Sequence, residues 1–261
     1  MRFVAVVVVF AAMLVSSRSH ATAVTVCAAP TGVVVSADSK LTIAGLAKTE
    51  AVNKIVPVGD RAVVAVTGVA IWSELRYDFW SFVPKATARL GRNPNPANVA
   101  EALRRRATQL FDGHGKAFAK AGMATYFIVA GQDEDGVAVW QVHVEATGAH
   151  VRATKERRFG RNDRDAQMLG WGFPAALAFD DKGGPLWTAI RQRTPSWLAQ
   201  LAKSGALTVY QRASLCGIPI AVAAEKDSFI GGTINQALVT GESGVLVATW
   251  SQPPSAPPRS R

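Results

Sequence analysis

The sequence predicts an α+β fold in which helices pack against antiparallel sheets. Three observations lead to this prediction. Short segments rich in β-branched residues come first, between Thr22 and Thr67. Two helical patterns and a hairpin follow, and further helical patterns precede a last hairpin over residues 233–250. No internal repeat or long interior linker interrupts this order, so we expect one domain over residues 22–250.

The first half of the chain alternates strand and turn signals. Four segments have strand composition: residues 22–27, 32–37, 53–58 and 61–67. The turn at Pro30-Thr31-Gly32 separates the first two, and Asp38 ends the second. Gly68 then opens a long helical pattern. Its apolar residues recur at helical spacing: Ile71, Leu75, Phe79 and Phe82.

The second half begins with a helix that starts at Asn95-Pro96, with proline in its first position. A hairpin follows over residues 125–144, and we expect a charged loop over 155–165. Helical segments are predicted at 167–178, 187–202 and 209–226, the last interrupted by Gly217 and Pro219. The tail, residues 251–261, is rich in proline and serine, and we expect it to be disordered.

The first 21 residues have the pattern of a secretory signal peptide. Arg2 precedes an apolar run from Phe3 to Val15, and a small, polar stretch follows. The run is shorter than the roughly 20 residues that a spanning helix needs. We therefore expect a soluble periplasmic or secreted protein; an uncleaved N-terminal anchor is the alternative.

The cleavage position remains open at the level of sequence. Cleavage after Ala21 would leave Thr22 at the N-terminus, and cleavage after Ala23 would leave Val24. Both positions have the small residues that signal peptidase prefers.

Composition excludes several classes of protein. With 49% apolar and 18% charged residues in 261, the chain is too hydrophobic to be disordered. Its two cysteines, Cys27 and Cys216, cannot form a disulfide scaffold or a four-cysteine zinc site. Both lie in apolar surroundings, which favours buried free thiols over a disulfide.

The net charge of +10 suggests a polyanion partner, but its distribution argues against one. Removal of residues 1–21, which carry two arginines and no acid, lowers the charge to +8. Arg104, Arg105 and Arg106 occupy consecutive helix positions and so point in different directions. We therefore expect no nucleic-acid partner. A weaker hypothesis is attraction to anionic polymers or membrane surfaces.

An N-terminal threonine carries both a nucleophilic hydroxyl and a base, its own α-amine. The α-amine has a reference pKa near 8, and a nearby ammonium lowers that pKa further. A carboxylate can hold the amine in place, and a backbone N–H can stabilise the oxyanion. The sequence supplies these groups in order, as Thr22, Asp38, Lys54 and Gly68, at intervals of 16, 16 and 14 residues.

These intervals and the surrounding residues resemble a proteasome β-type subunit. The segments that carry the resemblance are Gly32–Thr42, Lys54-Ile55, Val66-Thr67-Gly68, and Ala224–Asn235 with the turn Gly241–Gly244. The hairpin over 127–144 also resembles the middle strands of that family. The similarity is strong at both ends and weak between about 150 and 215. It implies the N-terminal nucleophile (Ntn) hydrolase fold, a four-layer αββα sandwich of two antiparallel sheets between helical layers.

The resemblance implies a role for each matched residue. Thr22 would be both nucleophile and base, and Asp38 and Lys54 would tune and orient it. The Gly68 amide would donate to the oxyanion, and Asp227 would lie in the outer shell near the amine. The substrate backbone would lie along Thr42 and Ala70. The primary specificity pocket would be apolar and lined by five residues: Leu41, Val52, Val56, Val66 and Ala70.

Two positions depart from the family pattern. Ile230 stands where the family usually has a serine before the Gly-Gly pair, and Trp171 stands where it has a serine between two glycines. Both serines help to position the amine and a water. Their loss removes supporting hydrogen bonds but not the nucleophile.

The predicted function is that of an exported threonine-type peptidase or amide hydrolase that acts through an acyl-enzyme on Thr22. Its substrate would be a peptide or small amide with an apolar side chain on the acyl side. We expect no cofactor and no metal, since His114, His143 and His150 lack metal-ligand spacing. No ATPase partner is implied, and a homo-oligomer remains open. The alternative is a non-catalytic assembly or binding subunit of the same fold.

Overall fold

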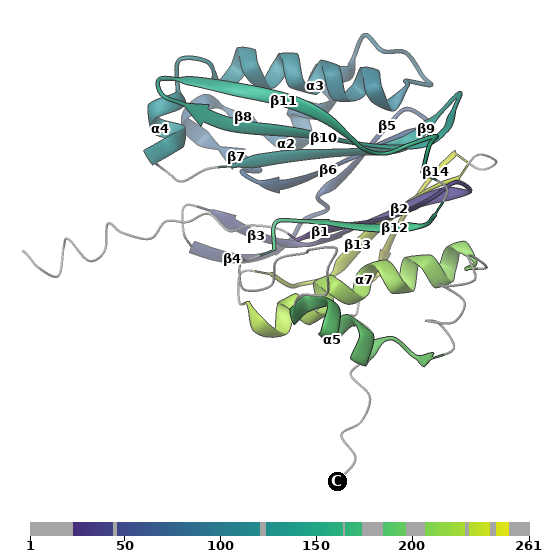
Figure 1. Cartoon of the computed structure of the whole chain (residues 1–261). Coiled ribbons are helices and arrows are strands. Elements are labelled where there is room, and N and C mark those ends of the chain that lie inside the picture. Colours follow the sequence, from purple (N-terminus) through teal and green to yellow (C-terminus); the bar gives the residue numbers. More distant parts are fainter. Residues whose placement is uncertain are drawn as a thin grey trace, which may run out of the picture.

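The computed structural model describes residues 23–43, 46–120, 124–163, 165–173, 185–196, 207–227, 230–240 and 244–250 (Figure 1). The predicted signal peptide, Thr22 and the tail over 251–261 lie outside these residues. The fold is α+β, as predicted, with antiparallel pairing throughout the described strands.

Within the described residues, two five-stranded sheets dominate the fold. The first sheet contains both ends of the domain. In spatial order its strands are β12 (Gln167–Trp171), β1 (Val24–Ala29), β2 (Gly32–Asp38), β13 (Ile234–Thr240) and β14 (Gly244–Trp250). The pairing of β2 with β13 joins the predicted N-terminal strands to the last hairpin.

The second sheet contains the middle of the chain. Its strands, in spatial order, are β11 (His150–Phe159), β10 (Gly136–Thr147), β9 (Thr125–Asp133), β6 (Ala62–Gly68) and β5 (Ile55–Val58). Two small pairs lie outside the main sheets. They are β3 (Lys40–Ile43) with β4 (Leu46–Ala51), and β7 (Ile71–Trp72) with β8 (Tyr77–Asp78).

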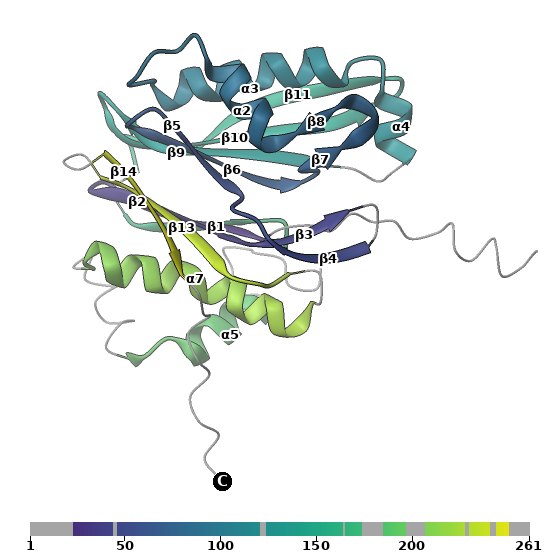
Figure 2. The ribbon, with the colours of Figure 1, turned by 180° about the vertical axis from the view of Figure 1, so that it is seen from behind.

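Helices cover the outer face of each sheet (Figures 1 and 2). Three lie against the second sheet: α2 (Phe79–Thr87), α3 (Pro96–Phe111) and α4 (Gly115–Lys120). The first sheet is covered by α7 (Val209–Lys226), and α5 (Pro185–Arg193) packs against α7. A short 3₁₀ turn, η1 (Ser73–Leu75), links β7 to β8. Among the described residues, no helix is long and apolar enough to cross a membrane.

The apolar residues separate into layers that match this arrangement. Alternate residues of β6 face opposite sides, since strand side chains have a period of two. Val63 and Ala65 pack between the sheets with Val24 and Val35, whereas Val64 and Val66 pack toward α2 and α3. Smaller clusters join α7 to the first sheet. Each sheet is therefore buried on both faces.

Several predicted elements are confirmed. The helix that begins after Asn95 does so because the Asn95 side chain accepts a hydrogen bond from the Ala97 N–H, with Pro96 in the first turn. The two hairpins form as predicted, over 125–147 and 234–250. Cys27 and Cys216 are free, buried thiols.

Four predictions about secondary structure are wrong. The helical pattern from Gly68 yields β7, η1 and β8 first, and α2 begins only at Phe79. The charged segment from Lys155 belongs to the edge strand β11 up to Phe159, because its charges point to solvent while Val151 and Ala153 stay buried. Residues 167–171 form β12, which pairs with β1, instead of a helix. Helix α7 also continues through Gly217 and Pro219 without a break.

Candidate active site

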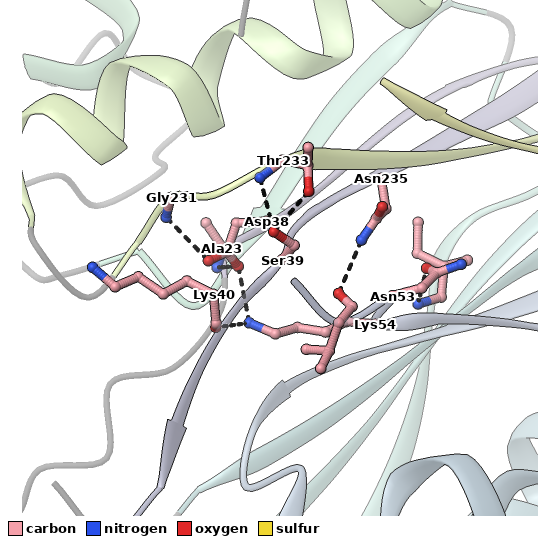
Figure 3. Close-up of polar contacts among 11 residues, drawn as sticks. Ala23, Asp38, Ser39, Lys40, Asn53, Lys54, Gly231, Thr233 and Asn235 are labelled. Atoms are coloured by element: carbon pink, nitrogen blue, oxygen red, sulfur yellow. Dashed lines mark hydrogen bonds and ion pairs between the residues drawn. The ribbon is translucent and has the colours of Figure 1, made fainter. Parts of the chain in front are cut away.

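Asp38 is the centre of a buried polar cluster at the end of β2 (Figure 3). Its Oδ1 accepts the backbone N–H of Ala23 at 3.1 Å and the Lys54 ammonium at 3.3 Å. Its Oδ2 accepts the N–H of Gly231 at 3.2 Å. The Asp38 N–H donates to the Ala23 carbonyl at 3.2 Å, so Ala23 is held at both its backbone groups. A carboxylate with these donors forms a fixed anionic centre beside the residue that follows Thr22.

Lys54 reaches Asp38 from the other sheet. Its side chain is fully buried, and Nζ also donates to the Lys40 carbonyl. The chain before β5 is fixed locally, because the Asn53 side chain accepts the N–H of Ile55 at 3.0 Å. The indole of Trp80 in α2 donates to the Asn53 carbonyl at 2.6 Å. These contacts aim the ammonium at Asp38.

The loop between α7 and β13 is attached to the same place by Ser39. The Ser39 Oγ accepts both the N–H and the hydroxyl of Thr233, at 2.8 and 2.9 Å. Gly232 has a φ of 77°, and a Cβ there would lie 2.4 Å from the Ser39 Oγ. Glycine is therefore required at this position, and the turn it permits carries Gly231 to Asp38.

Burial shifts the pKa of both members of the ion pair. Desolvation raises the pKa of Asp38, against the opposing charge of Lys54 and the hydrogen bonds of the cluster. Desolvation lowers the pKa of Lys54, against the opposing charge of Asp38. Each charge therefore stabilises the other in a site from which water is largely excluded.

The Asp38→Asn variant is expected to gain stability as the pH rises toward 10. Without its carboxylate partner, the pKa of Lys54 in the folded state falls further below the value of about 10.4 in the unfolded chain. Between these two values the unfolded chain binds more protons, so the free energy of unfolding increases with pH. Thermal unfolding of the variant at pH 7 and pH 9.5 measures this change in the free energy of unfolding. A variant that loses stability over that interval relative to the wild type would contradict it.

Gly68 ends β6 with a φ of 90°. A Cβ there would lie 1.8 Å from the Ala124 carbonyl oxygen, so the backbone of β9 leaves room for glycine only. The next N–H, of Val69, donates to the Thr125 hydroxyl at 3.2 Å. The positive φ redirects the chain where the predicted oxyanion donor lies.

The five residues predicted to line the specificity pocket come together in one apolar cluster. Leu41, Val66 and Ala70 are buried members of the cluster between the second sheet and its helices, and Val52 and Val56 pack against them. Thr42 pairs with Ala47 in the β3–β4 hairpin. Ala70 is fixed by its carbonyl, which accepts the N–H of Phe79 at 2.8 Å.

Asp227 and Ile230 connect α7 to the cluster. The Asp227 N–H donates to the Ala223 carbonyl at the end of α7, and its own carbonyl accepts the N–H of Ile230. Ile230 is buried and packs in the same apolar group as Ala23. At the position where the family pattern has a serine, this chain therefore has an apolar residue, Ile230, which shares an apolar cluster with Ala23.

Trp171, the second departure, lies opposite Val24 in the register of β12 and β1. Both departures therefore lie beside the start of β1.

Sequence reasoning missed three polar residues of this site. Ser39 and Thr233 hold the Gly231 loop, and the Asn235 side chain donates to the Val52 carbonyl at 3.0 Å. The signal available in the sequence was the pair Gly231-Gly232, because two adjacent glycines next to a predicted site indicate a tight backbone contact. In the structure, Gly232 lies close to Ser39.

Among the described residues, no group of three or more histidine, cysteine, aspartate or glutamate side chains is arranged to hold a metal ion. No protein-family model matches the chain, and no curated protein matches it. A function must therefore be argued from the residues and geometry described above.

Proposed function

We propose that the protein is an exported threonine-type Ntn hydrolase that cleaves a peptide or small amide through Thr22. One observation carries this proposal. The backbone N–H of Ala23, the residue directly after Thr22, shares the Asp38 Oδ1 with the buried Lys54 ammonium. A carboxylate and an ammonium that meet at the second residue of the mature chain would flank an N-terminal amine and hydroxyl.

The contacts of Ala23 also favour one of the two cleavage positions. Ala23 is fully buried, and both its N–H and its carbonyl are bonded to Asp38. Cleavage after Ala23 would remove both bonds and leave buried polar groups unpaired, which costs about 1–3 kcal/mol for each. Cleavage after Ala21 retains Ala23 and makes Thr22 the N-terminus.

The proposed reaction has two steps. In the first, the Thr22 Oγ attacks the substrate carbonyl carbon, and its proton passes to the α-amine of Thr22. The oxyanion is stabilised by the Gly68 amide and by the positive charge of Lys54. The C–N bond then breaks, and the ammonium of Thr22 gives the proton to the departing amine. In the second step, a water attacks the ester, releases the acid and restores the Thr22 hydroxyl.

The arrangement of layers supports the finer assignment of fold. Helices α2–α4, the two sheets, and α5 with α7 follow one another in space. This order is the one expected for the four-layer sandwich of a proteasome β-type domain. The apolar group of Leu41, Val66 and Ala70 supports an apolar side chain on the acyl side of the cleaved bond.

An epoxyketone tests the proposal, because it forms a stable ring only with a residue that offers both a free amine and a hydroxyl. We expect one adduct, on Thr22, in the exported protein. The alternative function, a non-catalytic assembly or binding subunit, rests on Ile230 and Trp171 in place of two serines. An unmodified Thr22 at saturating probe, with a β-lactone also unreactive, would favour that alternative.

A further inference from the structure

Trp171 joins the two sheets beside the start of β1. Its partner in the β12–β1 register is Val24, and both side chains pack in the core between the sheets. The indole Nε1 donates to the Gln141 Oε1, from β10 of the opposite sheet, at 2.7 Å. Since Val24 follows Ala23, this Trp171–Gln141 bridge lies beside the polar cluster of Asp38 and Lys54.

A row of polar and aromatic side chains continues from this bridge toward Gly68. Along β10, His143 follows Gln141 on the same face. His143 pairs with Tyr126 of β9, and the two rings stack with centroids 4.3 Å apart and an interplanar angle of 5°. Tyr126 pairs in turn with Thr67 of β6, the residue that precedes Gly68. The row therefore spans the second sheet from β6 to β10.

This row and the apolar cluster of the predicted specificity pocket lie on opposite faces of the second sheet. Val66 belongs to the cluster between the second sheet and its helices, whereas Thr67 faces the first sheet. Gly68 follows both residues. If the side chain of the acyl part of the substrate lies beside Val66, the Thr67 face is available to the leaving group.

We propose that Thr67, Tyr126, His143, Gln141 and Trp171 form the subsite for the leaving group, and that the Trp171–Gln141 bridge limits this subsite to compact amines. Ammonia, a small amine or a single amino acid would fit, and a longer peptide would not. This inference rests on the proposed function and specifies its substrate class.

The burial and the hydrogen bond of Trp171 explain the limit. Trp171 has 8% of its surface exposed; strand pairing with β1 fixes its backbone, and the hydrogen bond to Gln141 fixes its indole. The indole thus links β12 to β10 across the core between the sheets. An extended leaving chain would have to break the bridge and expose apolar surface of the core.

The row can also bind the leaving amine. Burial lowers the pKa of His143, although the nearby charge of Glu145 opposes this shift, and the imidazole side chain is 24% exposed. A neutral imidazole has one ring nitrogen that accepts a hydrogen bond, so it can receive an N–H of the departing amine. The Tyr126 and Thr67 hydroxyls add further donors and acceptors in the same row.

The test compares two substrates with the same acyl part, N-acetyl-leucine. One is the primary amide, which releases ammonia, and the other is extended by Ala-Ala-Ala. We expect the wild type to favour the amide in kcat/KM. In Trp171→Ser and in Gln141→Ala the ratio should shift toward the extended peptide by about tenfold or more. Trp140→Ser is the control, because Trp140 is on the opposite face of β10, near Lys155 and Arg157, and its ratio should match the wild type.

The outcomes separate this inference from the proposed function. Thermal unfolding establishes that each variant is folded. If Trp171→Ser does not fold, Gln141→Ala still tests the bridge, because it breaks the hydrogen bond but keeps the buried indole. An unchanged ratio in folded Gln141→Ala, with both substrates cleaved, overturns the leaving-group subsite and leaves the nucleophile untouched. A wild type that prefers the extended peptide also overturns it. A wild type that cleaves neither substrate and is not labelled at Thr22 overturns both.

Discussion

Replacing Lys54 with methionine is expected to lower the free energy of unfolding by about 3–5 kcal/mol and to reduce hydrolysis at least about a hundredfold. Methionine keeps the volume of the buried chain but removes the charge, so the Asp38 carboxylate is left unpaired in a site where both side chains are fully buried. Thermal unfolding and kcat/KM on an N-acyl-leucine amide measure the two effects.

The double variant Asp38→Asn, Lys54→Met separates stability from activity. With both charges removed, the penalty of an unpaired buried ion disappears, and stability should recover most of what the single variant loses. The side-chain amide oxygen of asparagine can still accept the Ala23 N–H, whereas its amide nitrogen cannot accept the Gly231 N–H. Activity should stay at the level of the single variant. Recovery of hydrolysis together with stability would show that the pair serves the fold alone and would contradict its role in the site.

Replacing Thr22 with alanine is expected to abolish hydrolysis, with a loss in kcat of at least about 10⁴-fold. The variant keeps the α-amine and the contacts of Ala23 with Asp38, but it has no hydroxyl to form the ester. Thr22→Ser is the matched control, since it retains the hydroxyl and the amine and should keep measurable turnover.

Both Thr22 variants need the same N-terminus as the wild type, which intact mass establishes. Activity in Thr22→Ala that equals the wild type would remove Thr22 from the mechanism. The stability of Thr22→Ala should differ little from that of the wild type, because no part of the Asp38–Lys54 pair is altered.

The sequence predicted the strands that carry Asp38 and Gly68 better than it predicted the middle of the fold. Asp38, Lys54 and Gly68 lie at strand ends, where alternating β-branched runs mark the boundaries clearly. The contacts of Ala23 and Gly231 with Asp38 depend on backbone groups, which no residue type reveals.

The errors concern segments whose local pattern conflicts with their tertiary surroundings. Residues 155–158 carry charges on the edge strand β11, and charges on an edge discourage pairing with other chains. Residues 167–171 do not alternate clearly between polar and apolar side chains, and their pairing with β1 decides that they form a strand. In the segment after Gly68, the apolar residues at helical spacing do not share one helix face. Phe79 and Phe82 pack in the core from α2, Leu75 of η1 packs against that core, and Ile71 of β7 is exposed.

The N-terminal sequence of the mature protein tests the central claim most directly. The account predicts that the mature chain begins Thr22-Ala23-Val24, with the free α-amine beside the hydroxyl that performs the attack. A mature chain that begins at Val24 would lack both the nucleophile and the Ala23 N–H that binds Asp38, and it would contradict the account.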